Sequence, residues 1–437
     1  MAGPVLIRDP AAAVAFVLAR DAALEPMGLG PSEAREKRRR MAASPLAFLR
    51  ATPGLFVADL AALAGPFGAP ARLRPREAPR LTIVGDAHLG NFGAFRGAAE
   101  GEPVFGINDH DQAGTGSPEW DLLRLAASIV IAARGAGGTD DDARAAAATA
   151  ARAYAGRVRA IAGGRDAGET AVDRAGAAGP VKKLLEKAKG QSRGELLEEH
   201  AARERADGSW AFGATDEVVP LPAAREHAVR AALAAYEGTL GPTPRARRPL
   251  AVLAVAEKRG SGGSSYGLDR HVALLGRPEP AKKPLLLELK SFPPSSLPGP
   301  DGAPQEADAG AVVAAMRVLG APQAANPLSG AARLGERSFL VREIDPEKRN
   351  LRVEKLDGPR DVSAVAETAA RCLAAAHACA AGSRGAAIAR WLGEGESEAS
   401  GPGDAGLALA VAGLAALYAD QVAADHAALA AAVRTSP

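Results

Sequence analysis

Two short apolar segments near residue 90 each run directly into acidic, amide and histidine side chains. The first reads TIVGDAHLGNFGAF (residues 82–95), and the second reads VFGINDHDQAGTGSPEWDLL (residues 104–123). Strand interiors favour β-branched and aromatic residues, and a buried carboxylate is costly unless it is paired. We therefore expect two strands whose ends carry a site for a metal ion or a phosphate.

The spacing of the polar residues indicates phosphoryl transfer. Asp86 and Asn91 lie five residues apart where the first strand ends, so one loop can direct both toward one ligand. Phosphoryl transfer requires a carboxylate that orients or deprotonates the acceptor hydroxyl, and oxygen ligands for Mg²⁺. We assign the first role to Asp86 and predict Asn91 and Asp109 as Mg²⁺ ligands. Asp111 is a further candidate ligand, unless alternation along an extended chain directs it to the other face.

The neighbouring residues are expected to support this site. His88 is predicted to orient the loop through a hydrogen bond rather than to bind the metal. Asp121, four residues into the next helix, is predicted to be structural and to bond the backbone of the Asp86 loop. Trp120 and Arg124 are interpreted as packing residues. The alternative for Asp86 is a turn-capping carboxylate, which is a common role for Asp in loops.

A second feature is a Gly/Ser-rich turn followed by a lysine. The turn RGSGGSSYGLDR lies between two apolar runs, and about twenty residues later the run LLLELK ends in Lys290. Glycines allow a backbone to approach phosphates closely, although such a turn is also typical of an ordinary hairpin. A lysine at the end of a strand is usually a solvated edge residue, whereas in a kinase-like strand it binds the α- and β-phosphates of the nucleotide. The predicted phosphate-covering residues are Gly260, Gly262, Gly263, Ser264 and Gly267.

The remaining pattern places a small β-rich part between helical parts. Residues 1 to about 75 are predicted to be helical. The basic run REKRRR (residues 35–40) is interpreted as a solvated helix face, and the alternative is that it contacts a phosphate or an acidic partner. A helix is predicted to begin with Ser117 as its N-cap. Residues 140–245 are expected to be mostly helical. Further predicted elements are three strands within 249–292, a helix at 306–320, a hairpin at 338–356 and helices at 362–382 and 405–433.

The two motifs together carry a resemblance to a known fold. GDAHLGN followed by INDHDQAGTGSPEWDL resembles the catalytic-loop and metal-loop pair of aminoglycoside and choline kinase-like phosphotransferases, which share the protein-kinase fold. Over most of its length, the chain more closely resembles the bacterial family called domain of unknown function 2252. That likeness runs from RMAASPLAFLR through GLDRHVALL, LLLELK and ARWLGEGE to YADQVAADH.

The resemblance implies an α+β, two-lobed, protein-kinase-like fold with a helix-rich large lobe and a small β-rich nucleotide lobe. Kinases place the glycine loop and the lysine before the catalytic loop, whereas here both follow it, so a circular permutation is expected. We therefore predict three parts. Residues 1–245 hold the N-terminal helices and both catalytic motifs, residues 246–358 form the nucleotide lobe, and residues 359–437 complete the large lobe. The Pro-rich stretches 241–250 and 291–304 are the expected boundaries.

One departure concerns the acidic partner of the lysine. A kinase-like lysine is normally held by a glutamate from the following helix, but Ala314 stands where the family pattern suggests an acid. Glu306 is the candidate substitute. The third loop glycine is also partly replaced, by Ser264 and Ser265. These departures favour a weakened or inactive kinase site as one alternative.

The function that these features favour is an ATP- and Mg²⁺-dependent phosphotransferase acting on a small molecule, with a protein acceptor second. Alternatives are a nucleotide-binding pseudokinase that regulates a partner and an adenylyltransferase, because a fold does not fix the chemistry. A two-metal phosphohydrolase is a weaker alternative. GDAH is similar to the first motif of calcineurin-like phosphoesterases, but the later GNH motif is absent and most other histidines lie in helical contexts without a motif.

Charge and cysteine content restrict partners and location. The chain has 53 basic and 51 acidic side chains, so its net charge does not favour a nucleic acid or a membrane surface. The two cysteines, Cys372 and Cys379, exclude a disulfide framework and are expected to be buried in a reducing cytosol. The longest apolar run, GLALAVAGLAALYA, is shorter than the roughly 18 residues of a spanning helix. A cytoplasmic protein is expected.

Overall fold

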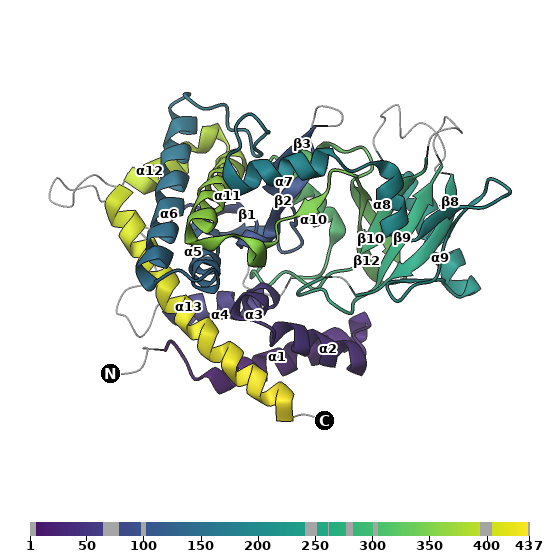
Figure 1. Ribbon diagram of the computed structural model, residues 1–437, viewed down its shortest axis with the longest axis horizontal. Coiled ribbons are helices and arrows are strands. Elements are labelled where there is room, and N and C mark those ends of the chain that lie inside the picture. Colours follow the sequence, from purple (N-terminus) through teal and green to yellow (C-terminus); the bar gives the residue numbers. More distant parts are fainter. Residues whose placement is uncertain are drawn as a thin grey trace.

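The computed structural model describes residues 6–63, 78–97, 102–240, 251–260, 262–276, 283–299, 305–393 and 404–435. The fold is mixed α+β, as predicted, and contains several small sheets. A helical body lies on one side of the molecule, a six-stranded sheet on the other, and four N-terminal helices below both (Figure 1). The predicted boundary at 241–250 falls outside the described residues.

The helical body packs mainly through alanine. The buried residues of α6 and α11 are largely Ala, including Ala146, Ala150, Ala366 and Ala370. Small side chains allow helices to pack closely, because the distance between two helix axes depends on the residues at the contact. Ser117 caps α5 by accepting a hydrogen bond from the Glu119 backbone, as predicted. The helices of this body are α5 (Pro118–Gly135), α6 (Asp140–Ala162), α7 (Gly179–Lys189), α11 (Gly358–Ala380), α12 (Ala386–Gly393) and α13 (Asp404–Thr435).

The six-stranded sheet is antiparallel with the order β11-β12-β10-β9-β8-β7. Helix α9 covers one face through Val229, Leu233 and Tyr236, and α8 with β5 and β6 packs on the other. The elements are β5 (Ala202–Glu204), β6 (Trp210–Phe212), β7 (Val218–Val219), β8 (Val252–Lys258), β9 (Arg270–Leu275), β10 (Leu285–Lys290), β11 (Gly330–Leu334), β12 (Arg337–Ile344), α8 (Arg193–Glu199), α9 (Ala223–Glu237) and α10 (Ala309–Val318). Because β7 pairs with β8 and α9 packs on the sheet, the β-rich part of the fold begins before residue 246, where the division was predicted.

Two smaller sheets join the sheet to the helical body. In one, β1 (Leu81–Ile83) pairs with β4 (Gly114–Gly116), and in the other the order is β13-β2-β3. The predicted hairpin at 338–356 is wrong, because β12 is already paired on both sides, with β10 and β11. The chain instead crosses to the other sheet, where β13 (Arg349–Asn350) pairs with β2 (Phe92–Arg96), which lies beside β3 (Pro103–Ile107).

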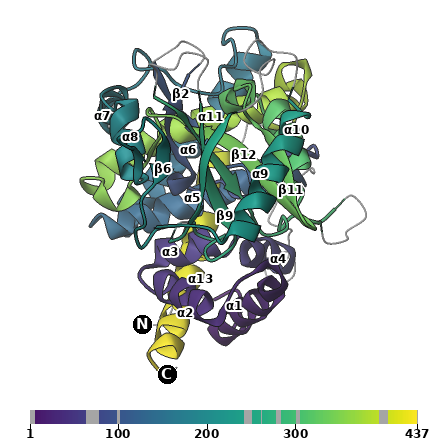
Figure 2. The ribbon, with the colours of Figure 1, turned by 90° about the vertical axis from the view of Figure 1, so that its right-hand side faces the viewer.

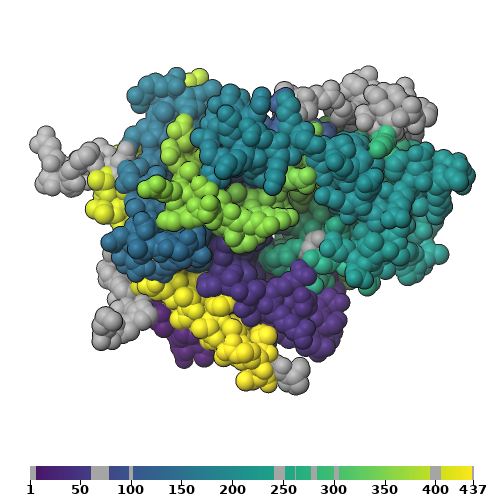
Figure 3. Space-filling model, in the orientation of Figure 1, coloured from purple at the N-terminus to yellow at the C-terminus, as the bar shows by residue number. Residues whose placement is uncertain are grey.

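The N-terminal helices are α1 (Pro10–Leu24), α2 (Pro31–Met41), α3 (Pro45–Ala51) and α4 (Pro53–Leu63). Figure 2 shows them beneath the sheet and the helical body, beside the end of α13. The space-filling view shows their purple atoms directly against the teal sheet region (Figure 3). Short 3₁₀ turns connect elements at Glu25–Met27, Leu89–Asn91, Pro322–Ala325, Val353–Lys355 and Ser383–Gly385.

The basic run in α2 is only partly a solvated face. Lys37 is 3% exposed, and its ammonium lies 3.1 Å from a carboxylate oxygen of Asp21. Arg40 donates a hydrogen bond to the carbonyl of Gly260 and lies over the ring of Tyr266. The run therefore anchors α2 to α1 and to the Gly/Ser-rich turn.

The two ends of the described chain are joined by ion pairs and hydrogen bonds. The guanidinium of Arg8 lies 2.7 Å from Asp59 in α4 and 2.6 Å from Asp425 in α13. The backbone amides of Ile7 and Arg8 donate to the side-chain oxygen of Gln421. The first residues described are thus fixed to the last helix.

Two expectations about helix surfaces are corrected. Cys372 is buried, but Cys379, in the last turn of α11, is exposed. Residues 405–435 of α13 form a helix long and apolar enough, by length and composition, to cross a membrane, which the apolar run alone did not predict. In its most apolar window, 56% of the residues are buried inside the molecule, as in the core helix of a folded domain.

Candidate functional site

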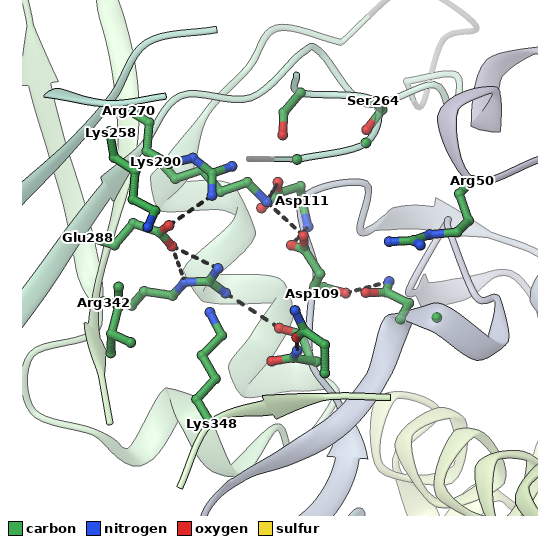
Figure 4. Close-up of a pocket in the computed structure, with 18 of the residues that line it drawn as sticks. Arg50, Asp109, Asp111, Lys258, Ser264, Arg270, Glu288, Lys290, Arg342 and Lys348 are labelled. Atoms are coloured by element: carbon green, nitrogen blue, oxygen red, sulfur yellow. Dashed lines mark hydrogen bonds and ion pairs between the residues drawn. The ribbon is translucent and has the colours of Figure 1, made fainter. Parts of the chain in front are cut away.

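A pocket of about 360 Å³ lies between the six-stranded sheet and the loops that follow β1 and β3 (Figure 4). Three segments that are distant in the sequence meet there, since Lys290 lies 181 residues after Asp109. Of the residues predicted for the site, those that line the pocket are Asp86, His88, Asn91, Asp109, Asp111, Gly262, Gly263, Ser264 and Lys290. Gly260 and Gly267 do not line it, but both have positive φ and shape the ends of the turn.

The backbone of the loop that carries Asp86 is held in place by hydrogen bonds to the side chain of Asp121. The two carboxylate oxygens of Asp121 accept hydrogen bonds from the amides of Val84 (2.7 Å) and Gly85 (2.9 Å). These are the backbone bonds expected of Asp121 from the sequence. Gly85 has a φ of 77°, and a Cβ there would lie 2.1 Å from the carbonyl oxygen of Gln112. The loop therefore requires glycine at this position.

A buried histidine and tyrosine extend this support. His377 Nε2 lies 3.0 Å from Asp121 Oδ2, and His377 Nδ1 lies 2.8 Å from the hydroxyl of Tyr154. Neither residue was predicted, because each lies in a helix without a motif, and only the tertiary packing of α6 and α11 against α5 brings them to Asp121. The chain from Tyr154 to Gly85 links the centre of the helical body to the Asp86 loop.

Replacing Asp121 should therefore destabilise the protein. In Asp121→Ala, two buried backbone N–H groups lose their acceptor, at about 1–3 kcal/mol each, so we expect a loss of about 2–6 kcal/mol of unfolding free energy. Urea denaturation measures this loss. The control is Asp141→Ala, because the side chain of Asp141 is 99% exposed. Equal stability of the two variants would contradict the support assigned to Asp121.

The carboxylate of Asp86 is engaged by a buried arginine. Arg124 is 0% exposed, its Nε lies 2.6 Å from Asp86 Oδ1, and it also donates to the carbonyl of Leu49. Burial raises the pKa of Asp86 above its usual value, although Arg124 acts in the opposite direction. Arg124 was interpreted from the sequence as a packing residue, and the ion pair to Asp86 corrects that interpretation.

His88 was predicted to orient the loop through a hydrogen bond, but its buried Nδ1 has no hydrogen-bond partner in the described part of the chain. Its Nε2 lies 3.7 Å from Asp86 Oδ2, which is longer than a hydrogen bond. Burial, with Arg50 and Arg124 nearby, holds the pKa of His88 well below its usual value. The imidazole is therefore neutral at physiological pH.

The amide of Asn91 ties the two loops together. Its Nδ2 donates to the backbone carbonyls of Asp86 (3.1 Å) and Asp109 (3.0 Å). Both donor hydrogens of the amide are thus used, and the side-chain oxygen remains as an acceptor for a ligand. This arrangement is compatible with the predicted role of Asn91 as an oxygen donor.

Lys290 is paired with the carboxylates of the second loop. Its ammonium lies 2.7 Å from Asp109 Oδ2 and forms a second ion pair with Asp111. Burial opposes ionisation of Asp109, but Lys290 and Arg342 lower its pKa, whereas burial and the charge of Asp109 raise the pKa of Asp111. The expected partner Glu306 is instead exposed, ahead of α10. Lys290 therefore takes its acidic partners from the predicted metal loop.

The donor set fits a magnesium ion bound together with phosphates. Within the described ranges, no group of three His, Cys, Asp or Glu side chains is arranged to hold a metal. Mg²⁺, however, is usually held by one or two carboxylates together with substrate phosphates and water. Asp109, Asp111 and the oxygen of Asn91 are hard oxygen donors of that kind, and Lys290 would have to leave the carboxylates for the ion to bind.

The far half of the pocket is strongly basic, and the sequence analysis did not identify it. Glu288 accepts from Arg270 (2.9 Å) and from Arg342 (2.8 Å), with Lys258 and Lys348 beside them (Figure 4). Burial alone would raise the pKa of Glu288, but the two arginines hold it well below its usual value. Alternation in β10 was the available signal, because it places Glu288 on the same face as Lys290.

Comparison with known proteins gives one family. The model of the family described as "Uncharacterized protein conserved in bacteria (DUF2252)" matches residues 30–432. No curated protein and no solved structure matches the chain. The matched range begins just before α2, ends within α13 and includes every residue that lines the pocket.

Proposed function

The chain belongs to the bacterial DUF2252 family, and we propose that it is an ATP- and Mg²⁺-dependent phosphotransferase acting on a small molecule. One observation carries the proposal. Asp86, Asn91, Asp109, the Gly/Ser-rich turn and Lys290 come from distant segments and yet line one pocket. Chemistry on a phosphate chain requires this combination of a carboxylate, oxygen ligands for Mg²⁺, a lysine and a glycine-rich cover.

The proposal includes a two-lobed, kinase-like fold with a permuted chain. The Gly/Ser-rich turn joins β8 to β9, and the adjacent strand β10 ends in Lys290. Helix α10 follows β10 in the sequence, as a helix follows the lysine strand in kinases. The catalytic and metal loops come from β1–β3, earlier in the chain, which is the reverse of the order in kinases.

Each residue then has a chemical role. Asp86, whose pKa is raised by burial, would accept the proton of the acceptor hydroxyl. Lys290 would hold the phosphates, and the turn containing Gly262 would cover them. Asn91, Asp109 and Asp111 would hold Mg²⁺, which neutralises charge on the transferring phosphoryl group when it is bound.

A second candidate is a nucleotide-binding protein without phosphotransfer activity. The observation in its favour is the ion pair between Asp86 and Arg124, which occupies one oxygen of the proposed base. The two candidates differ in turnover and share nucleotide binding. Adenylyl transfer stays an alternative that the mass of a modified acceptor would distinguish.

Nucleotide binding is the direct test of both candidates. Calorimetry should show Mg²⁺-dependent ATP binding to the wild type. In the double variant Asp109→Ala with Lys290→Ala, we expect affinity to fall by at least about 100-fold, because one charged contact to phosphate and one metal ligand are lost.

The control removes one basic and one acidic side chain elsewhere. Lys183→Ala with Glu186→Ala changes two exposed residues of α7 and should leave affinity unchanged. A wild type that does not bind ATP would overturn the proposed function, and so would a double variant that binds as tightly as the control.

A further inference from the structure

The half of the pocket farthest from Asp86 is lined by a group of basic side chains. Lys258 comes from β8, Arg270 from β9, Arg342 from β12, and Lys348 from the segment after β12. Figure 4 shows all four on the same side of the pocket, around Glu288. We call these four residues the inner basic cluster.

The cluster carries more positive charge than its surroundings neutralise. Glu288 is the carboxylate at its centre, and it bonds Arg270 and Arg342. Lys258 lies 3.6 Å from Glu217, whose side chain is 65% exposed, so that ion pair is weakened by solvent. Four cations around one buried carboxylate are a formal excess of three positive charges within this group. The carboxylates of Asp109 and Asp111, which act on Arg342, and of Asp345, which acts on Lys348, offset part of that excess.

Two further observations complete this account of charge. Glu199 at the pocket rim is 55% exposed and lies 3.7 Å from Arg349, outside the cluster. Lys348 makes no ion pair with any residue in the described part of the chain. An anion is therefore the group that the cluster lacks.

Lys348 is costly to the folded protein in the absence of such an anion. Burial and the nearby charge of Arg342 lower its pKa to about 8, because both disfavour the ammonium form. Side chains that are unfavourable for stability in the free protein are characteristic of binding sites. The position of Lys348 thus indicates a ligand rather than a role in folding.

Among the residues that the structure describes, the pocket offers little of the apolar surface that a nucleobase would need. Leu196 and Ile344 are the aliphatic side chains among its lining residues, and the remainder are charged, polar or glycine. Small-molecule sites for ring systems are lined mainly by hydrophobic and aromatic side chains. Glu288 lies two residues before Lys290 in β10 and faces the same side of the strand. A charged side chain rather than an apolar one therefore lines the pocket at this position.

We propose that the inner basic cluster is an anion subsite that binds a phosphate group of an oligophosphate ligand, in the place where an apolar slot would bind a nucleobase. The inference rests on the proposed function, because it assigns the ligand class of the same pocket. Lys290 and the Gly/Ser-rich turn would hold one end of the phosphate chain, and Lys348, Arg342 and Lys258 the other.

Calorimetry on the full chain with Mg²⁺ tests the subsite with three probes: ATP, inorganic tripolyphosphate and adenosine. We expect tripolyphosphate to bind within about tenfold of ATP, and adenosine to bind at least about 100-fold more weakly than either. Lys348→Met should weaken tripolyphosphate binding by about 10- to 100-fold, as loss of a charged hydrogen bond does. Its thermal midpoint should equal or exceed that of the wild type.

Lys183→Met is the matched control, because Lys183 is exposed on α7 and the charge change is the same. If ATP binds and tripolyphosphate does not compete with it, the subsite is wrong and the proposed function stands. If tripolyphosphate binds and ATP does not, the subsite stands and ATP is wrong as the donor. If neither binds, both are overturned. Unchanged tripolyphosphate affinity in Lys348→Met also overturns the subsite.

Discussion

Asp86→Asn is expected to reduce turnover by about 10²- to 10⁴-fold while leaving ATP affinity nearly unchanged, because a general base acts on the acceptor hydroxyl. The substitution retains the size of the side chain and an oxygen that can accept from Arg124 Nε. ADP production measures turnover, and calorimetry measures affinity on the same protein. Loss of turnover without loss of affinity is the pattern expected of a catalytic carboxylate.

The control for this prediction is Asp141→Asn, in the first turn of α6, whose side chain is 99% exposed. It should retain the wild-type rate. If Asp86→Asn also retains that rate, Asp86 is not the base. A wild type that binds ATP and produces no ADP would instead favour the nucleotide-binding candidate, in which Arg124 keeps Asp86 engaged.

Arg124→Leu is expected to cost about 3–5 kcal/mol of unfolding free energy. Arg124 is fully buried, and its removal leaves the carboxylate of Asp86 and the carbonyl of Leu49 without their partner. Breaking a buried pair from one side leaves an uncompensated charge, which is the costly case. Chemical denaturation with a two-state fit measures the loss.

The matched variant is the double change Asp86→Asn with Arg124→Leu. Because it also removes the carboxylate charge, we expect it to be more stable than Arg124→Leu alone, and the difference gives the coupling between the two residues. If the double variant loses as much stability as the two single variants added together, the ion pair contributes nothing. Arg124 would then be only a packing residue, as the sequence first indicated.

The predictions that agreed with the structure rest on local patterns. The strands before Asp86 and Asp109, the N-cap at Ser117 and the backbone bonds of Asp121 all follow from residues close in sequence. The resemblance implied that Lys290 and Asp109 belong to one site, since no local pattern relates segments so far apart, but their ion pair was not predicted. The roles proposed for these residues stay predictions.

The features that were missed depend on which distant elements meet. The segment after β12 looked like the second strand of a hairpin, but β12 has neighbours on both sides and β13 pairs with β2. His377 contacts Asp121 because α11 packs beside α5 and α6. Alternation shows which residues of a strand share a face, but it does not identify the strands that bring further cations to that face.

The ion pairs of Arg8 have a consequence for the order of folding during synthesis. Asp425 is translated 417 residues after Arg8, with which it forms an ion pair. Domains generally fold from the N-terminus as they emerge, but α1 and α4 lack this contact until α13 has been translated. A ribosome-bound chain stopped before α13 should therefore expose α1 and α4 to protease, and release of the full chain should protect them.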